Sequence, residues 1–428
     1  MSENPDKKTM IRRGWCAVAL GSAFFCYQFI VRVFPNILHD ELMDILNLNT
    51  ASFGVIISAY GWAYALMQLP LGLAIDRWGP RYLVSSASLL CAIGCLLFIV
   101  AKNIYVAWIG RFLMGMGSAC GFMSCVKLAT LWLPTRFLAR AIALTMLCGT
   151  LGAVLGGTPL SLYVNAVGPH ACIVTLAGLG VVMGLLLLLF IPHAPPPKKF
   201  LSCPKSTGTH NHPLVNLKTI MLNPQSWIIG TYSMLMYVPI TVWGEAWGVP
   251  FVERATQSTE KMAAMAITCM FAGAAAGSPL FTAISDLWRS RRFPMVLGSV
   301  LALATNAMIV FIADIPLMGM YVLFFLAGLV YTAKILTFSS ICEIVPRSMS
   351  GVSVAMVNAI VMMTGPIYHP LVGHLIESHA TRGGLLPADY IYTYMDYHAA
   401  LYVVPLSTLG AFFLAFFIKE THPDRPSS

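Results

Sequence analysis

Between two long apolar runs, the chain reads Gly72-Leu-Ala-Ile-Asp76-Arg77-Trp-Gly79-Pro-Arg81. The two glycines serve different purposes, since Gly72 lets neighbouring helices approach closely and Gly79 permits a tight turn. Asp76 can pair with a nearby arginine or with a helix amino terminus, where a negative charge is stabilised. We therefore predict that the chain crosses an apolar medium, turns at this charged stretch and crosses back.

The composition identifies that medium as a lipid bilayer. Hydrophobic residues make up 58% of the 428-residue chain and charged residues only 10%, against roughly 25% charged in soluble domains. A helix needs about 20 mainly apolar residues to span a bilayer, which leaves room for about twelve spans and no soluble domain. The formal charge of +9 does not indicate nucleic-acid binding, because the basic residues lie in short gaps between apolar runs.

Twelve apolar runs are separated by polar gaps, and we predict one spanning helix for each. They cover residues 14–38, 51–75, 81–101, 104–133, 139–164, 170–192, 226–251, 260–285, 293–313, 316–344, 349–376 and 398–418. Eighteen basic residues fall on the side of the amino terminus, four on the other side and four within spans. Because basic loops stay in the cytoplasm, we expect both termini to be cytoplasmic, in a bacterial inner membrane.

The stretch 193–224 divides the spans six and six. It contains three consecutive prolines and four lysines, which are typical of an extended cytoplasmic linker. The regions on either side, 1–192 and 225–428, share a charged pattern, since Asp76 precedes Arg81 and Asp286 precedes Arg291 by the same offset. We predict an all-α membrane protein of two six-helix, pseudo-symmetric halves.

The charged turn resembles the signature G-x-x-x-D-R-x-G-R-R/K between helices 2 and 3 of the major facilitator superfamily. The run Arg111-Phe-Leu-Met-Gly115-Met-Gly117 is similar to the helix-4 pattern of that family, whose arginine is often linked to proton coupling. The resemblance covers essentially the whole chain and implies the twelve-helix transporter fold. It also implies a cytoplasmic gate, which we assign to Gly72, Asp76, Arg77, Gly79, Arg81 and, in the second half, Asp286.

Two further runs resemble one branch of the superfamily. Phe34-Pro35-Asn36 and Trp243-Gly-Glu-Ala-Trp-Gly-Val-Pro250 are similar to sequences in the branch that holds bacterial phagosomal amino-acid transporters and lysosomal dipeptide transporters. This resemblance implies import of an amino acid or a short peptide. The span 139–164 is rich in glycine but lacks the G-P-x-x-G-G order typical of drug and proton antiporters, which disfavours export.

Charged side chains deep in a span are costly and mark functional candidates. The candidates here are Arg32, Arg111, Lys127, Lys334 and Glu245. The family fold would place Arg32 and Glu245, on helices 1 and 7, at similar depth on opposite walls of a central cavity. We predict a clamp in which Arg32 holds a carboxylate and Glu245 an ammonium group. The alternative is that the two residues pair with each other.

Polar and aromatic residues recur at four-residue spacing near these charges, as expected for one face of a helix. The predicted substrate-binding set comprises Tyr27, Gln28, Arg32, Tyr60, Tyr64, Gln68, Tyr237, Thr241, Trp243, Glu245 and Lys334. Lys334 has packing and snorkelling as alternatives, and Lys127 lies close enough to the cytoplasm to snorkel. Tryptophans near span ends, such as Trp243, are also typical of an interfacial aromatic belt.

Proton coupling is predicted at Glu245 and Arg111. A desolvated carboxylate can titrate near neutral pH, and a neighbouring cation would respond when it does. Facilitated uniport is the alternative mechanism. His369 and His374 have no acidic neighbour in the sequence, so we interpret them as packing residues, with pH sensing as the alternative.

The expected function is alternating-access import of a small polar or zwitterionic solute. An exporter of drug-like or siderophore-like metabolites is the second candidate. An enzyme is not expected, because no phosphate-binding loop, G-x-S-x-G or H-E-x-x-H motif is present. We expect no cofactor and no metal site, membrane lipid and a small molecule as partners, no nucleic acid, and a monomeric state.

Overall fold

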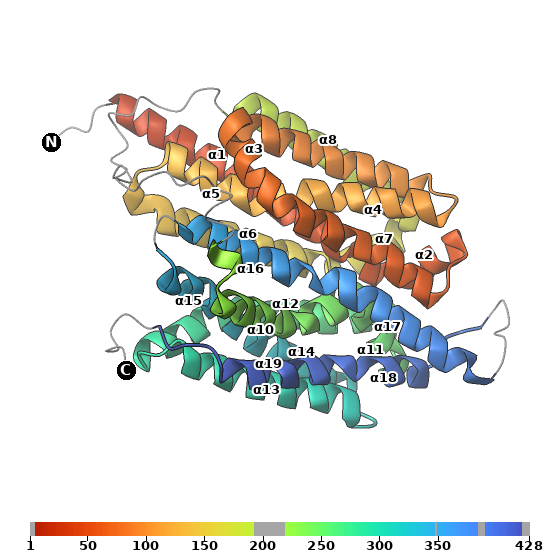
Figure 1. Cartoon of the computed structure of the whole chain (residues 1–428). Coiled ribbons are helices and arrows are strands. Elements are labelled where there is room, and N and C mark those ends of the chain that lie inside the picture. The colour runs from red at the N-terminus through yellow and green to blue at the C-terminus, as the bar shows by residue number, and fades with distance from the viewer. Residues whose placement is uncertain (1–4, 192–218, 347–348, 384–389, 422–428) are drawn as a thin grey trace.

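The computed structural model describes residues 5–191, 219–346, 349–383 and 390–421 (Figure 1). All regular structure in these ranges is helical. The helices that precede residue 192 form what we call the amino-terminal segment. They are α1 (Pro5–Ile37), α2 (His39–Leu46), α3 (Thr50–Ile99), α4 (Ile104–Ser118), α5 (Cys120–Trp132), α6 (Thr135–Leu155), α7 (Thr158–Val167) and α8 (Pro169–Phe190).

The helices after residue 218 form the carboxyl-terminal segment. They are α10 (Pro224–Pro239), the π-helix η2 (Ile240–Trp247), α11 (Gly248–Thr256), α12 (Glu260–Leu287), α13 (Arg292–Phe311), α14 (Leu317–Tyr331), the 3-10 helix η3 (Thr332–Ile335), α15 (Leu336–Ile344), α16 (Ser350–Met362), α17 (Thr364–Ala380), the 3-10 helix η5 (Thr381–Gly383), α18 (Tyr394–Leu401) and α19 (Val403–Ala415). Residues 193–218 of the predicted linker lie outside the described residues.

Ten helical stretches of the described residues are long and apolar enough to cross a membrane. The pair α6 and α7, bent by 45°, would make an eleventh. The predicted span 226–251 is not among them, and the structure divides it into α10, η2 and α11. The chain is therefore a multi-pass membrane protein with ten or eleven candidate spans.

Local sequence explains where several spans begin and bend. Asn49 and Asn103 cap α3 and α4 by accepting hydrogen bonds from Ser52 N and Val106 N, which satisfies amides that lack helical partners. Gly79 interrupts α3 with a φ of 77°, a left-handed conformation that costs little only for glycine. This bend lies at the charged turn that the sequence predicted.

The two ends of the bundle differ in what they carry. The start of α1 and helix α15 lie at one end of the bundle in Figure 1, which we call the terminal end, whereas α2 and α18 lie at the opposite, distal end. Hydrogen bonds between the two segments gather toward the distal end in the described part of the chain, as from Thr50 to Gly373 and from Ser161 to Glu260. The structure is thus a conformation closed at its distal end.

Glycines allow helices of each segment to pack backbone to backbone. A Cβ atom at Gly115 of α4 would overlap the Tyr60 carbonyl of α3, and one at Gly328 of α14 would overlap the Met270 carbonyl of α12. These contacts bring α3 against α4 and α12 against α14, which fixes the helices that carry the site.

The Gly328 contact gives a first prediction. Gly328→Ala forces α12 and α14 apart, and overpacking of this kind costs about 1–3 kcal/mol. We expect a lower melting temperature and less monodisperse protein in detergent, measured by fluorescence-detected size-exclusion chromatography. Gly178→Ala in α8 is the matched control, because its added Cβ meets no atom within 4 Å. Equal stability of the two variants would contradict the packing role.

Candidate functional site

A buried ion pair joins the two segments. Arg32 of α1 donates from Nη2 and Nε to Oε1 of Glu245 in η2, over 2.7 and 2.9 Å. Arg32 and Glu245 are 6% and 4% exposed. Removing one partner of such a pair typically costs about 3–5 kcal/mol, because the other charge is left buried and uncompensated. The sequence left open whether these residues face each other across a cavity or pair, and in this conformation they pair.

The segment that carries Glu245 is an unusual helix held by α1. All eight residues of η2 are buried, and π-helical stretches frequently occur at functional sites. Asn36, one turn beyond Arg32, donates from Nδ2 to Trp243 O over 2.7 Å and accepts from Val249 N over 3.0 Å. Helix α1 therefore holds η2 through one ion pair and one hydrogen bond to its backbone, and a second hydrogen bond reaches the start of α11.

His369 contacts the second oxygen of Glu245. Its Nε2 lies 3.6 Å from Glu245 Oε2, and the residue is 1% exposed. Its Nδ1 is buried without a hydrogen-bond partner. Sequence reasoning missed this contact, because the acidic partner comes from η2 and not from a neighbouring turn of α17. The carboxylate thus lies between an arginine of one segment and a histidine of the other.

Two more cations complete the charged cluster. Arg111 of α4 donates from Nη1 to Val31 O over 3.0 Å, and its Cζ lies 4.9 Å from the Tyr60 ring centroid. Lys334 lies on η3, where its Nζ is 3.6 Å from the Tyr237 ring centroid. Aromatic faces attract cations most strongly where water is excluded. The cluster therefore holds three cationic side chains and one carboxylate.

Several predicted binding residues converge on Arg32. Tyr60 and Tyr237 face its guanidinium, with ring centroids 5.8 and 5.4 Å from Cζ. The Tyr60 hydroxyl donates to Gln28 Oε1 over 3.0 Å, and the Tyr64 ring lies 6.2 Å from that of Tyr60. Aromatic and polar groups from both segments thus surround the arginine.

Four other predicted residues differ in what they contact. Gln68 Nε2 and Thr241 Oγ1 are buried and have no hydrogen-bond partner among the described residues. Tyr27 instead donates to the Leu176 carbonyl of α8, over 2.9 Å. The indole of Trp243 donates to an asparagine of α13, also over 2.9 Å. The structure does not bring Tyr27 or the Trp243 indole into the cluster.

Among the polar contacts that cross between the segments at the distal end, one group centres on Arg254 and Glu377. Arg254 Nη2 donates to Asp40 Oδ2 over 2.9 Å, and its Nε donates to Tyr392 O over 2.8 Å. The Tyr392 hydroxyl and the Thr50 hydroxyl both donate to Glu377 Oε2. Asp40 and Thr50 belong to the amino-terminal segment and the other three to the carboxyl-terminal one. We call these five residues the distal clasp.

The predicted gate at the terminal end is described only in part. The side chains of Asp76 and Arg77 and the surroundings of Gly72 lie outside the described residues. Arg81 has its Cζ 5.8 Å from the Tyr82 ring centroid. In the carboxyl-terminal segment, Asp286 lies 3.4 Å from Arg291 Nη1, and Arg291 also reaches a glutamate of α15. Gating by these residues stays a prediction.

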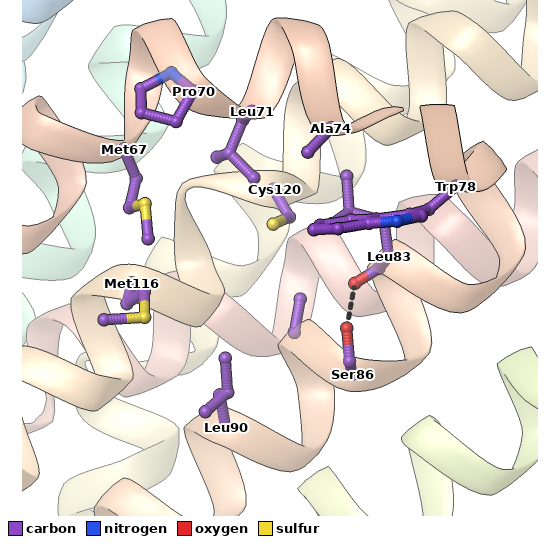
Figure 2. Close-up of a pocket in the computed structure, with 11 residues that line it drawn as sticks. Met67, Pro70, Leu71, Ala74, Trp78, Leu83, Ser86, Leu90, Met116 and Cys120 are labelled. Atoms are coloured by element: carbon purple, nitrogen blue, oxygen red, sulfur yellow. Dashed lines mark hydrogen bonds between the residues drawn. The ribbon is translucent and has the colours of Figure 1, made fainter. Parts of the chain in front are cut away.

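A separate cavity of about 510 Å³ lies between α3, α4 and α5 (Figure 2). Its wall is almost entirely apolar, and the hydroxyl of Ser86 is turned to the Leu83 carbonyl of its own helix. None of the charged cluster lines this cavity, so it has no group to recognise a polar solute. Among the described residues, no group of three histidine, cysteine or acidic side chains is placed to hold a metal.

Comparison with known proteins places the chain among transporters. The model of the Major Facilitator Superfamily matches residues 20–252 and 246–428. A probable anion transporter of Arabidopsis thaliana is 27% identical over 50% of this chain and 52% of its own length. A probable sulfoacetate transporter of Cupriavidus necator is 24% identical over 39% of each, and a probable galactarate/D-glucarate transporter of Escherichia coli is 30% identical over 26% of each. The chain thus spans about half or less of these relatives.

Solved structures share the fold over nearly the full chain. A bacterial homologue of the human lysosomal transporter Spinster, inward-facing and unoccupied, superposes with a TM-score of 0.79 at 15% identity, covering 97% of this chain and 98% of that one. The nucleoside transporter NupG gives 0.73 at 14% identity, covering 95% and 98%. At such identities the likeness concerns the fold alone.

Replacing Asn36 tests how α1 holds η2. Asn36→Leu removes the side-chain hydrogen bonds to Trp243 O and Val249 N, and a buried polar group that loses its partner costs about 1–3 kcal/mol. We expect a clear loss of thermal stability, measured by differential scanning fluorimetry. Asn165→Leu is the control, since Asn165 is exposed and makes only a 3.5 Å contact to Ser161. A stable Asn36→Leu protein would show that η2 needs no support from α1.

Replacing Arg254 tests the distal clasp. Arg254→Gln removes the charge that contacts Asp40, so we expect more molecules open at the distal end. Distances between spin labels on α2 and α18 would report the opening, with Arg382→Gln, an exposed arginine, as control. Unchanged distances would rule out a gating role for Arg254.

The clasp also has a predicted pH dependence. Partial burial would raise the pKa of Asp40, but the hydrogen bond to His39 and the Arg254 charge outweigh it and hold the pKa well below its usual range. The clasp is therefore stabilised above the ordinary pKa of an aspartate and weakened only as the pH falls through the lowered one. We expect the label distances to stay constant between pH 5 and 8, about the range in which an unperturbed aspartate is ionised.

Proposed function

Because the chain belongs to the Major Facilitator Superfamily, we propose that it imports a small organic anion together with a proton. It is a secondary transporter and not an enzyme. The observation that carries the proposal is the buried pair of Arg32 and Glu245, surrounded by further cations. Such a site favours a negatively charged cargo over a neutral or cationic one.

The pair also supplies the coupling. Opening the distal end separates α1 from η2 and would leave Arg32 and Glu245 as lone buried charges, at a cost of about 3–5 kcal/mol. A proton on Glu245 removes one of these charges, and a carboxylate or sulfonate of the substrate replaces Glu245 at Arg32. Neither step alone compensates both charges. Proton and anion must therefore bind together before the carrier can change conformation.

His369 positions the proton. Its Nε2 faces Glu245 Oε2, so a proton on that oxygen can be shared with the imidazole while Arg32 is released from Oε1. Arg111 keeps the α1 backbone in place through the Val31 carbonyl, next to Arg32. The arginine can then exchange one anionic partner for another without movement of its helix.

An anion fits this site better than the zwitterion expected from the sequence. The zwitterion requires Glu245 to receive an ammonium group, whereas Glu245 contacts Arg32 and His369. The relatives described above carry names of anion, sulfoacetate and galactarate/D-glucarate transporters, which agree with an anionic cargo. They lend no support to the amino-acid and dipeptide branch.

The proposal includes the finer layout expected from the sequence. It takes α10, η2 and α11 together as one broken crossing and α6 with α7 as another, which gives twelve crossings in two halves, 1–192 and 225–428, joined by the linker 193–224. It places the terminal end in the cytoplasm of a bacterial cell, with the protein monomeric in the inner membrane. The closed distal end then corresponds to an inward-facing carrier.

Transport assays on Glu245→Gln test the coupling. Proteoliposomes would be given a pH gradient, acidic outside, and supplied externally with labelled sulfoacetate or D-glucarate. We expect the wild type to accumulate label and Glu245→Gln to lose accumulation by roughly tenfold or more, because the amide cannot take up a proton. Exchange of internal for external anion should persist in the variant.

The control is Asp314→Asn, which alters an exposed carboxylate with a positive φ that asparagine tolerates. If the wild type takes up the anion to the same level with and without the pH gradient, the protein is a uniporter and the proposed coupling is wrong. If the wild type transports neither sulfoacetate nor D-glucarate, the proposed substrate class is wrong.

A further inference from the structure

Lys334 is a cation without an anionic partner in the part of the chain that the structure describes. Its Nζ lies against the Tyr237 ring, 3.6 Å from the centroid, and 5.8 Å from that of Tyr331. It is carried by η3, a 3-10 turn between α14 and α15, and such interruptions often mark functional positions in a helix. A side chain that snorkelled would point along its helix toward the membrane surface, but Lys334 points across to α10.

One tyrosine ring relates Lys334 to Arg32. Tyr237 has Arg32 Cζ 5.4 Å and Lys334 Nζ 3.6 Å from its ring centroid. The two cationic centres are therefore at most about 9 Å apart, since both lie so close to one ring. Charge-assisted hydrogen bonds are about 2.7–2.9 Å long, so one short molecule can contact both cations at once.

The charge of the cluster changes during the proposed cycle. With Glu245 ionised, it holds three cationic side chains and one anionic one. With Glu245 protonated and Arg32 released, three cations remain, and buried charges without partners are costly. A substrate with one acidic group compensates Arg32 only. A substrate with two acidic groups compensates Lys334 as well, which leaves Arg111, already held by Val31 O and the Tyr60 ring.

We infer that the transported anion carries two acidic groups, one bound by Arg32 and the other by Lys334, in a molecule of about two to six carbons in all. This inference rests on the proposed function and narrows its substrate class to dicarboxylates and their sulfonate analogues. Tyr237 sets the spacing, because its ring lies beside both cations. Lys334 is then a specificity-determining residue, which selects diacids over monoacids.

Matched pairs of acids test the inference directly. D-glucarate and D-gluconate differ in one acidic group, as do succinate and butyrate, and sulfoacetate and acetate. Binding to the full-length purified protein would be measured by isothermal titration calorimetry at a pH where Glu245 can be protonated. We expect the affinity of the best-binding diacid to exceed that of its matched monoacid by roughly tenfold or more, as is typical of one additional charged hydrogen bond.

The variants assign that preference to Lys334. Lys334→Gln should lower diacid affinity by roughly tenfold or more and leave the affinity of the matched monoacid within about threefold. Lys334→Arg should restore the diacid preference, because the charge returns at the same position. Folding of each variant is checked by its melting temperature without ligand.

Three results would overturn the inference. Equal affinity of every diacid and its matched monoacid would remove the need for a second cationic contact while leaving the proposed function intact. If Lys334→Gln lowers the affinity for the diacid and for the matched monoacid equally, Lys334 has only a general structural role. If no acid of either kind bound, the proposed function itself would fail, and the inference with it.

Discussion

The ion pair between Arg32 and Glu245 is the interaction on which the rest of this structure depends. It connects the amino-terminal segment to the carboxyl-terminal one where both side chains are buried. A buried pair adds little net stability, but a lone buried charge is strongly unfavourable. The protein therefore cannot separate α1 from η2 without replacing each partner. In the proposed mechanism, a proton replaces one partner and an anion the other, so this constraint is the physical basis of the proposed coupling.

The surroundings of the pair allow this exchange without unfolding the site. Asn36 holds the backbone of η2, Arg111 holds the backbone of α1, and His369 contacts the oxygen of Glu245 that Arg32 does not use. The glycine contacts of α4 and α14 keep the flanking helices close. The distal clasp adds a second set of contacts between the segments, farther from the cluster and partly exposed. Such contacts break at lower cost than buried ones, so the buried pair dominates the barrier to opening.

The sequence predicted the membrane class, the superfamily and the bend at Gly79, since these follow from composition, motif spacing and the conformational freedom of glycine. It also singled out Arg32 and Glu245 as charges within spans and left open whether they pair. It missed the contact of His369 with Glu245, because no local pattern relates α17 to η2. It grouped Trp243 with the binding residues as an apolar wall near Glu245, whereas the Trp243 indole donates to Asn306 of α13. Roles for the gate residues, from Gly72 to Asp286, stay predictions.

The most direct test of the central claim is the number of protons taken up when an anion binds. The purified protein is titrated calorimetrically with an acid that it binds, in several buffers of different ionisation enthalpy. The dependence of the heat on the buffer gives that number without transport or reconstitution. The account predicts uptake of about one proton per anion near neutral pH, since one carboxylate must be neutralised to release Arg32. The uptake should disappear in Glu245→Gln. Binding of the anion with no proton uptake by the wild-type protein would contradict it.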